Sequence, residues 1–151
     1  MEVREYRSSD CPQMARLFYD TVHNVNAKDY SRIQLDAWAD GNVCLEEWDY
    51  SFSRHLTLVA VDGDEIVGFG DMDEGGYLDR LYVGFRRQGE GIGTAICDLL
   101  ESRVRVQKYT VHASLTAKSF FERRGYVSVK KQRVYRRGVE LTNFVMEKNC
   151  P

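Results

Sequence analysis

The sequence lacks the features of a membrane-spanning, secreted or nucleic-acid-binding protein. Its longest largely apolar run, Leu56 to Val61, is far shorter than the roughly 20 residues of a transmembrane helix. The first residues, Met1 to Arg4, contain no apolar core of a secretory signal peptide. Lysine and arginine number 21 against 23 acidic residues, so there is no basic excess for a nucleic acid. We therefore expect a cytoplasmic protein with neither a membrane nor a nucleic acid as partner.

Cysteine is scarce, and its spacing shows neither a CxxC pair nor the cysteine and histidine pattern of a metal site. The four cysteines are Cys11, Cys44, Cys97 and Cys150. Because a reducing compartment keeps thiols reduced, we expect no disulfide and no metal. A catalytic thiol needs a cation or a histidine nearby. No such signature accompanies Cys97, so we expect it to be a small buried residue.

What the sequence contains is enough for one globular domain of 151 residues, which we place at residues 1–148 with a tail at 149–151. Alternating and helical apolar patterns predict strands at 3–6, 55–61, 65–72, 77–83, 109–113, 127–135 and 139–146. They predict a first helix after Asp10, two short helical pieces between 31 and 55, a helix from Ile92 and a short helix before Gly125. The run of strands from 55 to 83 counts against a parallel nucleotide-binding fold, in which each strand is followed by a helix.

Three glycines, Gly89, Gly91 and Gly93, lie where the strand ending at Val83 leads into the helix that starts at about Ile92. The first backbone N–H groups of a helix have no partner within the helix, and the helix dipole favours negative charge there. The turn therefore predicts a phosphate or diphosphate site. A helix start that merely uses glycine is the alternative.

Two common phosphate loops do not fit this turn. A P-loop needs lysine and then serine or threonine after its last glycine, and here Gly93 is followed by Thr94 and Ala95. A dinucleotide fingerprint needs glycine at Thr94 and an acidic residue about twenty positions further, where the chain reads Val111-His112-Ala113. Both can be set aside.

The pattern that fits is Gln/Arg-x-x-Gly-x-Gly/Ala, filled by Gln88, Gly91 and Gly93. It resembles the coenzyme A loop of the GNAT superfamily of N-acetyltransferases. The stretch from Ser114 to Tyr126, with Ala117 and Gly125, resembles a second GNAT signature. It departs from the usual form at Ser114, where asparagine commonly binds the pantetheine arm, and at Phe121, where tyrosine commonly protonates the leaving thiolate.

The resemblance implies an α/β fold with a mixed, mostly antiparallel sheet of six to seven strands and about four flanking helices. The sheet would splay between the strand ending at Val83 and the strand ending near Ser114, with acetyl coenzyme A in the gap. The residues expected to bind the coenzyme are Leu81, Tyr82, Val83, Arg86, Arg87, Gln88, Gly89, Glu90, Gly91, Ile92, Gly93, Thr94, Ser114, Ala117, Phe120 and Phe121.

Catalysis of acetyl transfer to an amine sets three further requirements. A fixed donor must stabilise the developing oxyanion, and the backbone N–H of Tyr82 or Val83 at the splayed strand edge is the candidate. A base must take the amine proton, for which Asp79 is the first choice and His23 the second. A surface aspartate and an ordinary histidine are the alternatives. With Phe121 at the usual tyrosine position, the acid could be Tyr126, Tyr82 or water.

The expected activity is therefore direct acetyl transfer, in a ternary complex, to a primary amine of a small molecule or peptide. A noncatalytic acyl coenzyme A binding or sensing domain is the alternative, because Ser114 and Phe121 depart from the family pattern. The sequence leaves the acceptor open among antibiotics, polyamines, amino acids and protein N-termini. A homodimer is also left open by the resemblance.

Overall fold

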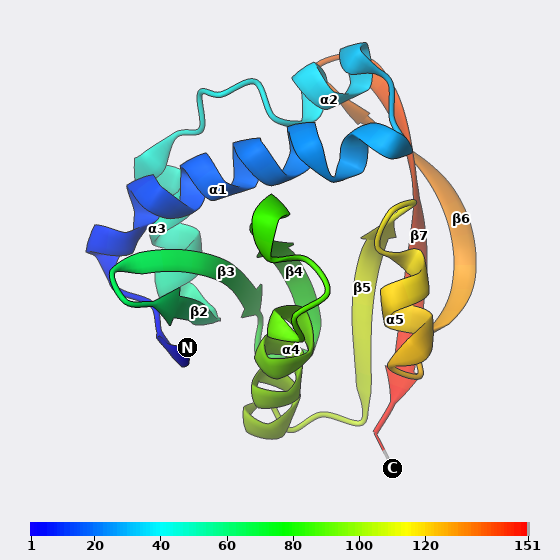
Figure 1. The fold of residues 1–151 in the computed structure, drawn as a ribbon. Coiled ribbons are helices and arrows are strands. Elements are labelled where there is room, and N and C mark those ends of the chain that lie inside the picture. Colours follow the sequence, from blue (N-terminus) through cyan, green and yellow to red (C-terminus); the bar gives the residue numbers. More distant parts are fainter. Residues whose placement is uncertain (151) are drawn as a thin grey trace.

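A computed structural model describes residues 1–150 as a seven-stranded mixed sheet with helices on both faces (Figure 1). The strand order is β1-β2-β3-β4-β5-β7-β6. The strands are β1 (Glu2–Glu5), β2 (Leu56–Asp62), β3 (Glu65–Met72), β4 (Tyr77–Val83), β5 (Lys108–Ser114), β6 (Val127–Arg136) and β7 (Val139–Asn149). All neighbouring strands are antiparallel except β4 and β5, which are parallel. The sheet thus has the predicted mixed, mostly antiparallel character.

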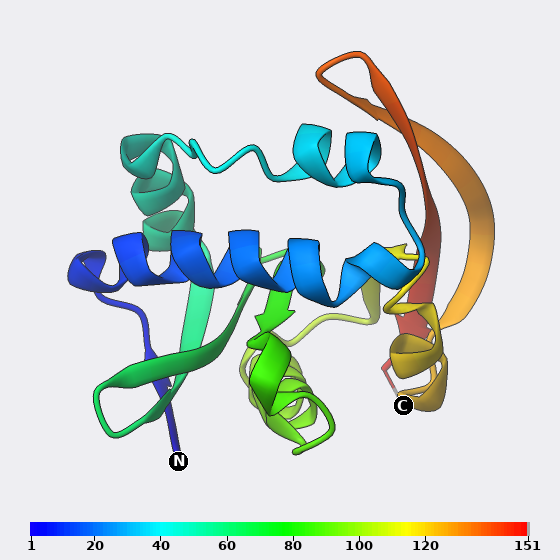
Figure 2. The ribbon, with the colours of Figure 1, turned by 45° about the horizontal axis from the view of Figure 1, so that its top comes forward.

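Five α-helices flank this sheet, at the five places where the sequence predicted helical segments, against the four or so that the resemblance implied. They are α1 (Cys11–Asn24), α2 (Arg32–Trp38), α3 (Leu45–Arg54), α4 (Ile92–Arg103) and α5 (Lys118–Arg123), with short 3-10 turns at Ser8–Asp10, Asn26–Lys28 and Phe85–Arg87. Figures 1 and 2 show α1, α2 and α3 on one side of the sheet and α4 and α5 on the other. No helix within residues 1–150 has the length and apolar character needed to cross a membrane.

Two apolar cores hold the layers together, one on each face of the sheet. On one face, Ile96 and Leu100 of α4 are fully buried against strand residues such as Leu58. On the other, Met14 of α1 is buried in a cluster that includes Phe69 of β3. The helical spacing of the apolar residues in α1 and α4 therefore marks the buried faces, as the sequence predicted.

Most predicted strand bounds agree with the structure to within one residue, and β7 differs by more. The strands at 65–72 and 77–83 and the helix start at Ile92 are confirmed. The first helix ends at Asn24. The strand β7 runs to Asn149, and the Cys150 N–H donates to the Gln107 oxygen at 2.8 Å, so the expected tail is shorter than predicted. Pro151 lies outside the described residues.

The sheet splays between β4 and β5, as predicted. These strands pair only at Tyr77 with Thr110 and at Leu78 with Val111. On its other side β4 pairs with β3, where the register shifts so that Met72 pairs with Leu78 and Asp71 with Arg80. This leaves Asp79 as the extra residue of a β-bulge. A bulge bends its strand, which accounts for β4 turning away from β5 at this point.

Candidate active site

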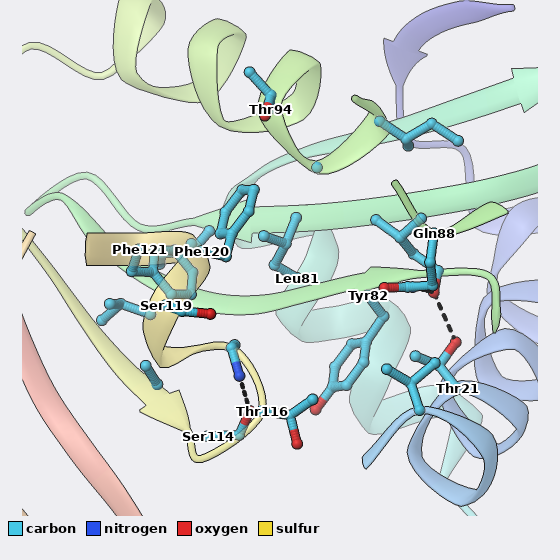
Figure 3. Close-up of a pocket in the computed structure, with 18 of the residues that line it drawn as sticks. Thr21, Leu81, Tyr82, Gln88, Thr94, Ser114, Thr116, Ser119, Phe120 and Phe121 are labelled. Atoms are coloured by element: carbon cyan, nitrogen blue, oxygen red, sulfur yellow. Dashed lines mark hydrogen bonds between the residues drawn. The ribbon is translucent and has the colours of Figure 1, made fainter. Parts of the chain in front are cut away.

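A cavity of about 780 Å³ occupies the gap between the splayed strands (Figure 3). Much of its lining comes from 78–83 of β4, 111–114 of β5, the start of α4, and Phe120 and Phe121 of α5, and α1, α2 and β7 contribute further residues. This volume is typical of a site for a small molecule or cofactor. Of the sixteen residues expected to bind a coenzyme, all except Arg86 and Glu90 line this cavity.

The glycine turn before α4 presents free backbone N–H groups to the cavity. Gly89 and Gly91 have φ of +76° and +83°, a conformation that side-chain-bearing residues rarely adopt. A Cβ atom at either position would meet no atom within 4 Å, so backbone conformation and not crowding by the protein requires glycine there. The first helical hydrogen bond is donated by the Ala95 N–H to the Gly91 oxygen at 3.0 Å. Within residues 1–150, the N–H groups from Gly89 to Thr94 have no acceptor.

The side chain of Gln88 fixes this turn to the end of β4. Its amide nitrogen donates to the Val83 oxygen at 2.8 Å, and the Thr21 hydroxyl donates to the same oxygen at 3.2 Å. Gln88 therefore acts on the protein backbone, and the free N–H groups of the turn remain for an anion at the positive end of the α4 dipole.

The hydrogen-bond register of β4 decides which backbone N–H faces the gap. The Gly84 N–H donates to the Val67 oxygen at 2.8 Å. Backbone N–H groups alternate sides along a strand. The Tyr82 N–H therefore points toward β3, and the Val83 N–H points toward the gap. The bonds from Thr21 and Gln88 to the Val83 oxygen agree with this direction. Of the two sequence candidates for an oxyanion donor, the geometry favours Val83.

Asp79 lines the cavity at the bulge and keeps a side chain that is 37% exposed. Its carboxylate accepts a hydrogen bond from Arg80 at 3.3 Å. Burial nonetheless raises the pKa of this carboxyl above its ordinary value. Asp79 is thus an accessible carboxylate at the point where the two strands separate.

An ion-pair network supports the bulge from behind. The Arg80 guanidinium donates to both oxygens of the fully buried Asp71 at 3.1 and 2.8 Å. His55 Nδ1 lies 2.8 Å from Asp71. The His55, Asp71 and Asp79 ligand atoms lie within 4.8 Å of one another, a spacing that a metal ion could use. Because Arg80 already supplies a cation to these carboxylates, we treat the group as a structural network.

Two sequence candidates for catalysis lie outside the cavity lining. His23 Nε2 is 2.8 Å from the Ala39 oxygen, and its ring stacks on Tyr19 with centroids 4.2 Å apart. The Tyr126 hydroxyl donates to Glu101 at 3.0 Å, and the residue is only 2% exposed. Burial and the Glu101 carboxylate raise the Tyr126 pKa, which makes its hydroxyl a poorer acid. We therefore do not retain either residue as a catalytic candidate.

The charged residues of the loop do not all reach the cavity. Arg86 instead lines a separate cavity of about 450 Å³ beside α1. Arg87 lines both cavities, but its guanidinium bonds Glu90 at 3.0 Å and Asp62 at 3.0 Å. Its charge is therefore already paired.

The second motif forms the wall of the cavity opposite β4. The Ser114 hydroxyl accepts from the Ala117 N–H at 3.0 Å and so caps the turn before α5. Phe121 is 3% exposed, and its ring packs against Phe120 and Tyr126. Phe121 thus offers packing at this position but no proton.

Several cavity-lining residues were not assigned from the sequence, among them Thr21, His112 and Thr116. The Thr116 hydroxyl is buried and has no hydrogen-bond partner within residues 1–150 (Figure 3). A signal for His112 was present, because apolar and polar residues alternate from Tyr109 to Ser114. That alternation places His112 on the face opposite the α4 core.

Comparisons with known proteins agree with this geometry. A family model described as the acetyltransferase (GNAT) domain matches residues 26–148, so the chain belongs to the GNAT superfamily of acetyltransferases. It is 34% identical over 147 residues to YafP, an uncharacterized N-acetyltransferase of Escherichia coli strain K12, covering 97% of this chain and 94% of that protein.

Solved structures show the same fold. The crystal structure of a GCN5-related N-acetyltransferase from Rhodopseudomonas palustris matches with a TM-score of 0.92 and 32% identity, over 99% of this chain and 95% of that one. The PaiA N-acetyltransferase from Thermoplasma acidophilum, solved in complex with coenzyme A, matches with a TM-score of 0.82 and 17% identity. That match covers 99% of this chain and 98% of the PaiA chain. At this identity the PaiA structure supports the fold alone.

The His55 and Asp71 pair predicts a pH-dependent stability. The hydrogen bond to Asp71 raises the pKa of His55 above its ordinary value of 6.5. A raised pKa in the folded state stabilises the protein fully below pH 6.5, and this contribution is lost as the pH rises through the raised value. We expect His55→Gln to lower the free energy of unfolding more at about pH 5.5 than at about pH 8.5, measured by urea denaturation. An equal loss at both pH values would contradict this assignment.

Proposed function

We propose that the protein transfers an acetyl group from acetyl coenzyme A to a primary amine of a small molecule or peptide, directly in a ternary complex. The observation that carries this proposal is that the free N–H groups before α4 and the N–H of Val83 open onto one cavity. Membership of the GNAT superfamily of acetyltransferases supports it. The cytoplasmic location and the homodimer stay predictions.

The residues present fit this donor. A diphosphate would bind the N–H groups from Gly89 to Thr94, where the chain offers donors without acceptors. The pantetheine arm would pass between β4 and α5, beside Leu81 and Phe120 (Figure 3). The buried, unpartnered hydroxyl of Thr116 is a further polar group that a bound molecule would satisfy.

Acetyl coenzyme A, when bound, would supply the thioester carbon that the amine attacks, with formation of the C–N bond and departure of the thiol. The Val83 N–H would then donate to the carbonyl oxygen as negative charge develops on it. Asp79, the first candidate for the base, is placed to hold the incoming ammonium, because it is the accessible carboxylate at the strand separation.

The group that protonates the leaving thiolate is proposed to be Tyr82 or water. Burial raises the pKa of Tyr82 as it does that of Tyr126, but Tyr82 lines the cavity, whereas Tyr126 bonds Glu101 outside the lining and Phe121 has no hydroxyl. A thiolate needs an acid less than an alkoxide does, because its conjugate acid is stronger. Loss of the usual tyrosine is therefore compatible with turnover.

An amine panel tests the proposed function against the noncatalytic alternative that Phe121 raises. Purified protein is mixed with acetyl coenzyme A and, separately, spermidine, kanamycin, 2-phenylethylamine, alanine or a peptide with a free N-terminal alanine, and thiol release is followed. We expect amine-dependent release with at least one of these compounds. Tight binding of coenzyme A without turnover of any amine would instead indicate a binding or sensing domain.

Substitution at the glycine turn tests the donor site. Gly91→Leu should weaken binding of coenzyme A in a calorimetric titration by at least about tenfold, because the side chain projects into the space beside the free N–H groups. Gly63→Leu is the matched control: its φ is also positive, at +62°, its Cβ would also meet nothing within 4 Å, and it lies in the turn between β2 and β3.

Both substitutions should cost roughly 1–3 kcal/mol in stability, because both force a side chain into the left-handed region. Only the Gly91 variant should lose affinity. Equal affinity in the two variants would show that the loop does not bind the diphosphate.

A further inference from the structure

The first residues beyond the last β4–β5 pair are Asp79 on β4 and His112 on β5. Pairing ends at Leu78 with Val111, so these two residues begin the opposite walls of the gap. Both line the cavity. The side chains of Val111 and Ala113 enter the core against α4, and His112 therefore points to the face covered by α1 and α2. Asp71, hydrogen bonded to Arg80, lies on that same face, behind Asp79.

His112 differs from the other two histidines in its surroundings. His23 is held by the Ala39 carbonyl and His55 by the Asp71 carboxylate, at 2.8 Å in each case. The His112 side chain is exposed to the cavity and forms no ion pair within residues 1–150. Its ring packs edge-on against Tyr77 with centroids 5.2 Å apart, and its Nδ1 lies 3.5 Å from the Gln132 side-chain nitrogen. These contacts orient the ring and leave Nε2 available.

An amine acceptor needs such a group. At neutral pH a primary amine is mostly an ammonium ion, which cannot attack a carbonyl until it loses a proton. A carboxylate attracts the ammonium strongly but is a weak base toward it. Imidazole is better matched to proton transfer near neutral pH. The ionisable groups around His112 include Tyr77 and Asp79 on β4, Lys130 on β6 and Glu147 on β7. The charges of Arg136, Asp71 and Asp73 also act on the neighbouring Tyr77.

We propose that His112 is a second catalytic residue, which takes the proton of the acceptor ammonium from the β5 wall while Asp79 holds that ammonium from the β4 wall. The inference rests on the proposed acetyl transfer. One ammonium proton passes to the neutral imidazole, which later releases it to solvent. The amine nitrogen then forms the C–N bond as the C–S bond breaks. The nitrogen loses a second proton, and the departing thiolate gains one to become the thiol.

Two nucleophiles separate this role from a structural one. The first is the panel amine that the unsubstituted protein uses fastest, which is protonated at neutral pH. The second is hydroxylamine, which is largely neutral there and needs no proton removed before attack. Thiol release is measured with both, after subtraction of the reaction without protein, for the unsubstituted protein, His112→Gln and His23→Gln. His23→Gln is the control, because it makes the same chemical change at a residue that does not line the cavity.

We expect His112→Gln to lower kcat with the protonated amine by about 100-fold or more and to leave most of the activity with hydroxylamine. His23→Gln should retain both activities. Coenzyme A affinity and the thermal midpoint of His112→Gln, measured alongside, should match those of the unsubstituted protein. An equal loss with both nucleophiles, or no loss with either, would overturn the role of His112. Failure of the unsubstituted protein with both nucleophiles would instead overturn the acetyl transfer itself.

Discussion

The site depends on the bulge at Asp79, one of the register shifts in the sheet and the one at which β4 leaves β5. Beyond Leu78 the strand β4 has no partner on its β5 side, so the Val83 N–H has no strand partner across the gap. Val83 is partly buried, and leaving such a backbone donor unpaired costs free energy that a bound carbonyl group would recover. The ion pair between Arg80 and the buried Asp71 fixes the register of the bulge, and Arg80 also stacks over Phe52 of α3. The gap is therefore a rigid feature of the fold.

The two ends of β4 serve different parts of the proposed reaction. At the last residue of β4, the side chains of Gln88 and Thr21 donate to the Val83 carbonyl. The Gln88 contact holds the glycine turn, whose free N–H groups face the cavity at the start of α4. At the bulge, Asp79 faces β5. A molecule that places an anion at the turn would thus lie along β4 with its other end near the separation of the strands. The order of these features along one strand links anion binding to the position of an acyl group.

Local signals made much of this predictable from the sequence. The strand-like runs at 65–72 and 77–83 and the glycines around Ile92 predicted two strands, a helix start and a turn with free N–H groups, because each depends on neighbouring residues. The position of His23 outside the cavity lining could not be predicted, because its contact with Ala39 is set by the path of the chain after α2. The bulge at Asp79 depends on the pairing of β3 with β4 and on Asp71, neither of which local sequence reveals. The position of Tyr126 was hidden for a similar reason, since its partner Glu101 belongs to α4.

The most direct test of this account is a crystal structure of the protein soaked with acetyl coenzyme A. The account predicts the diphosphate on the N–H groups from Gly89 to Thr94 and the thioester oxygen within hydrogen-bond distance of the Val83 N–H. A bound molecule whose diphosphate lies away from this turn, or whose thioester lies outside the gap between β4 and β5, would contradict it.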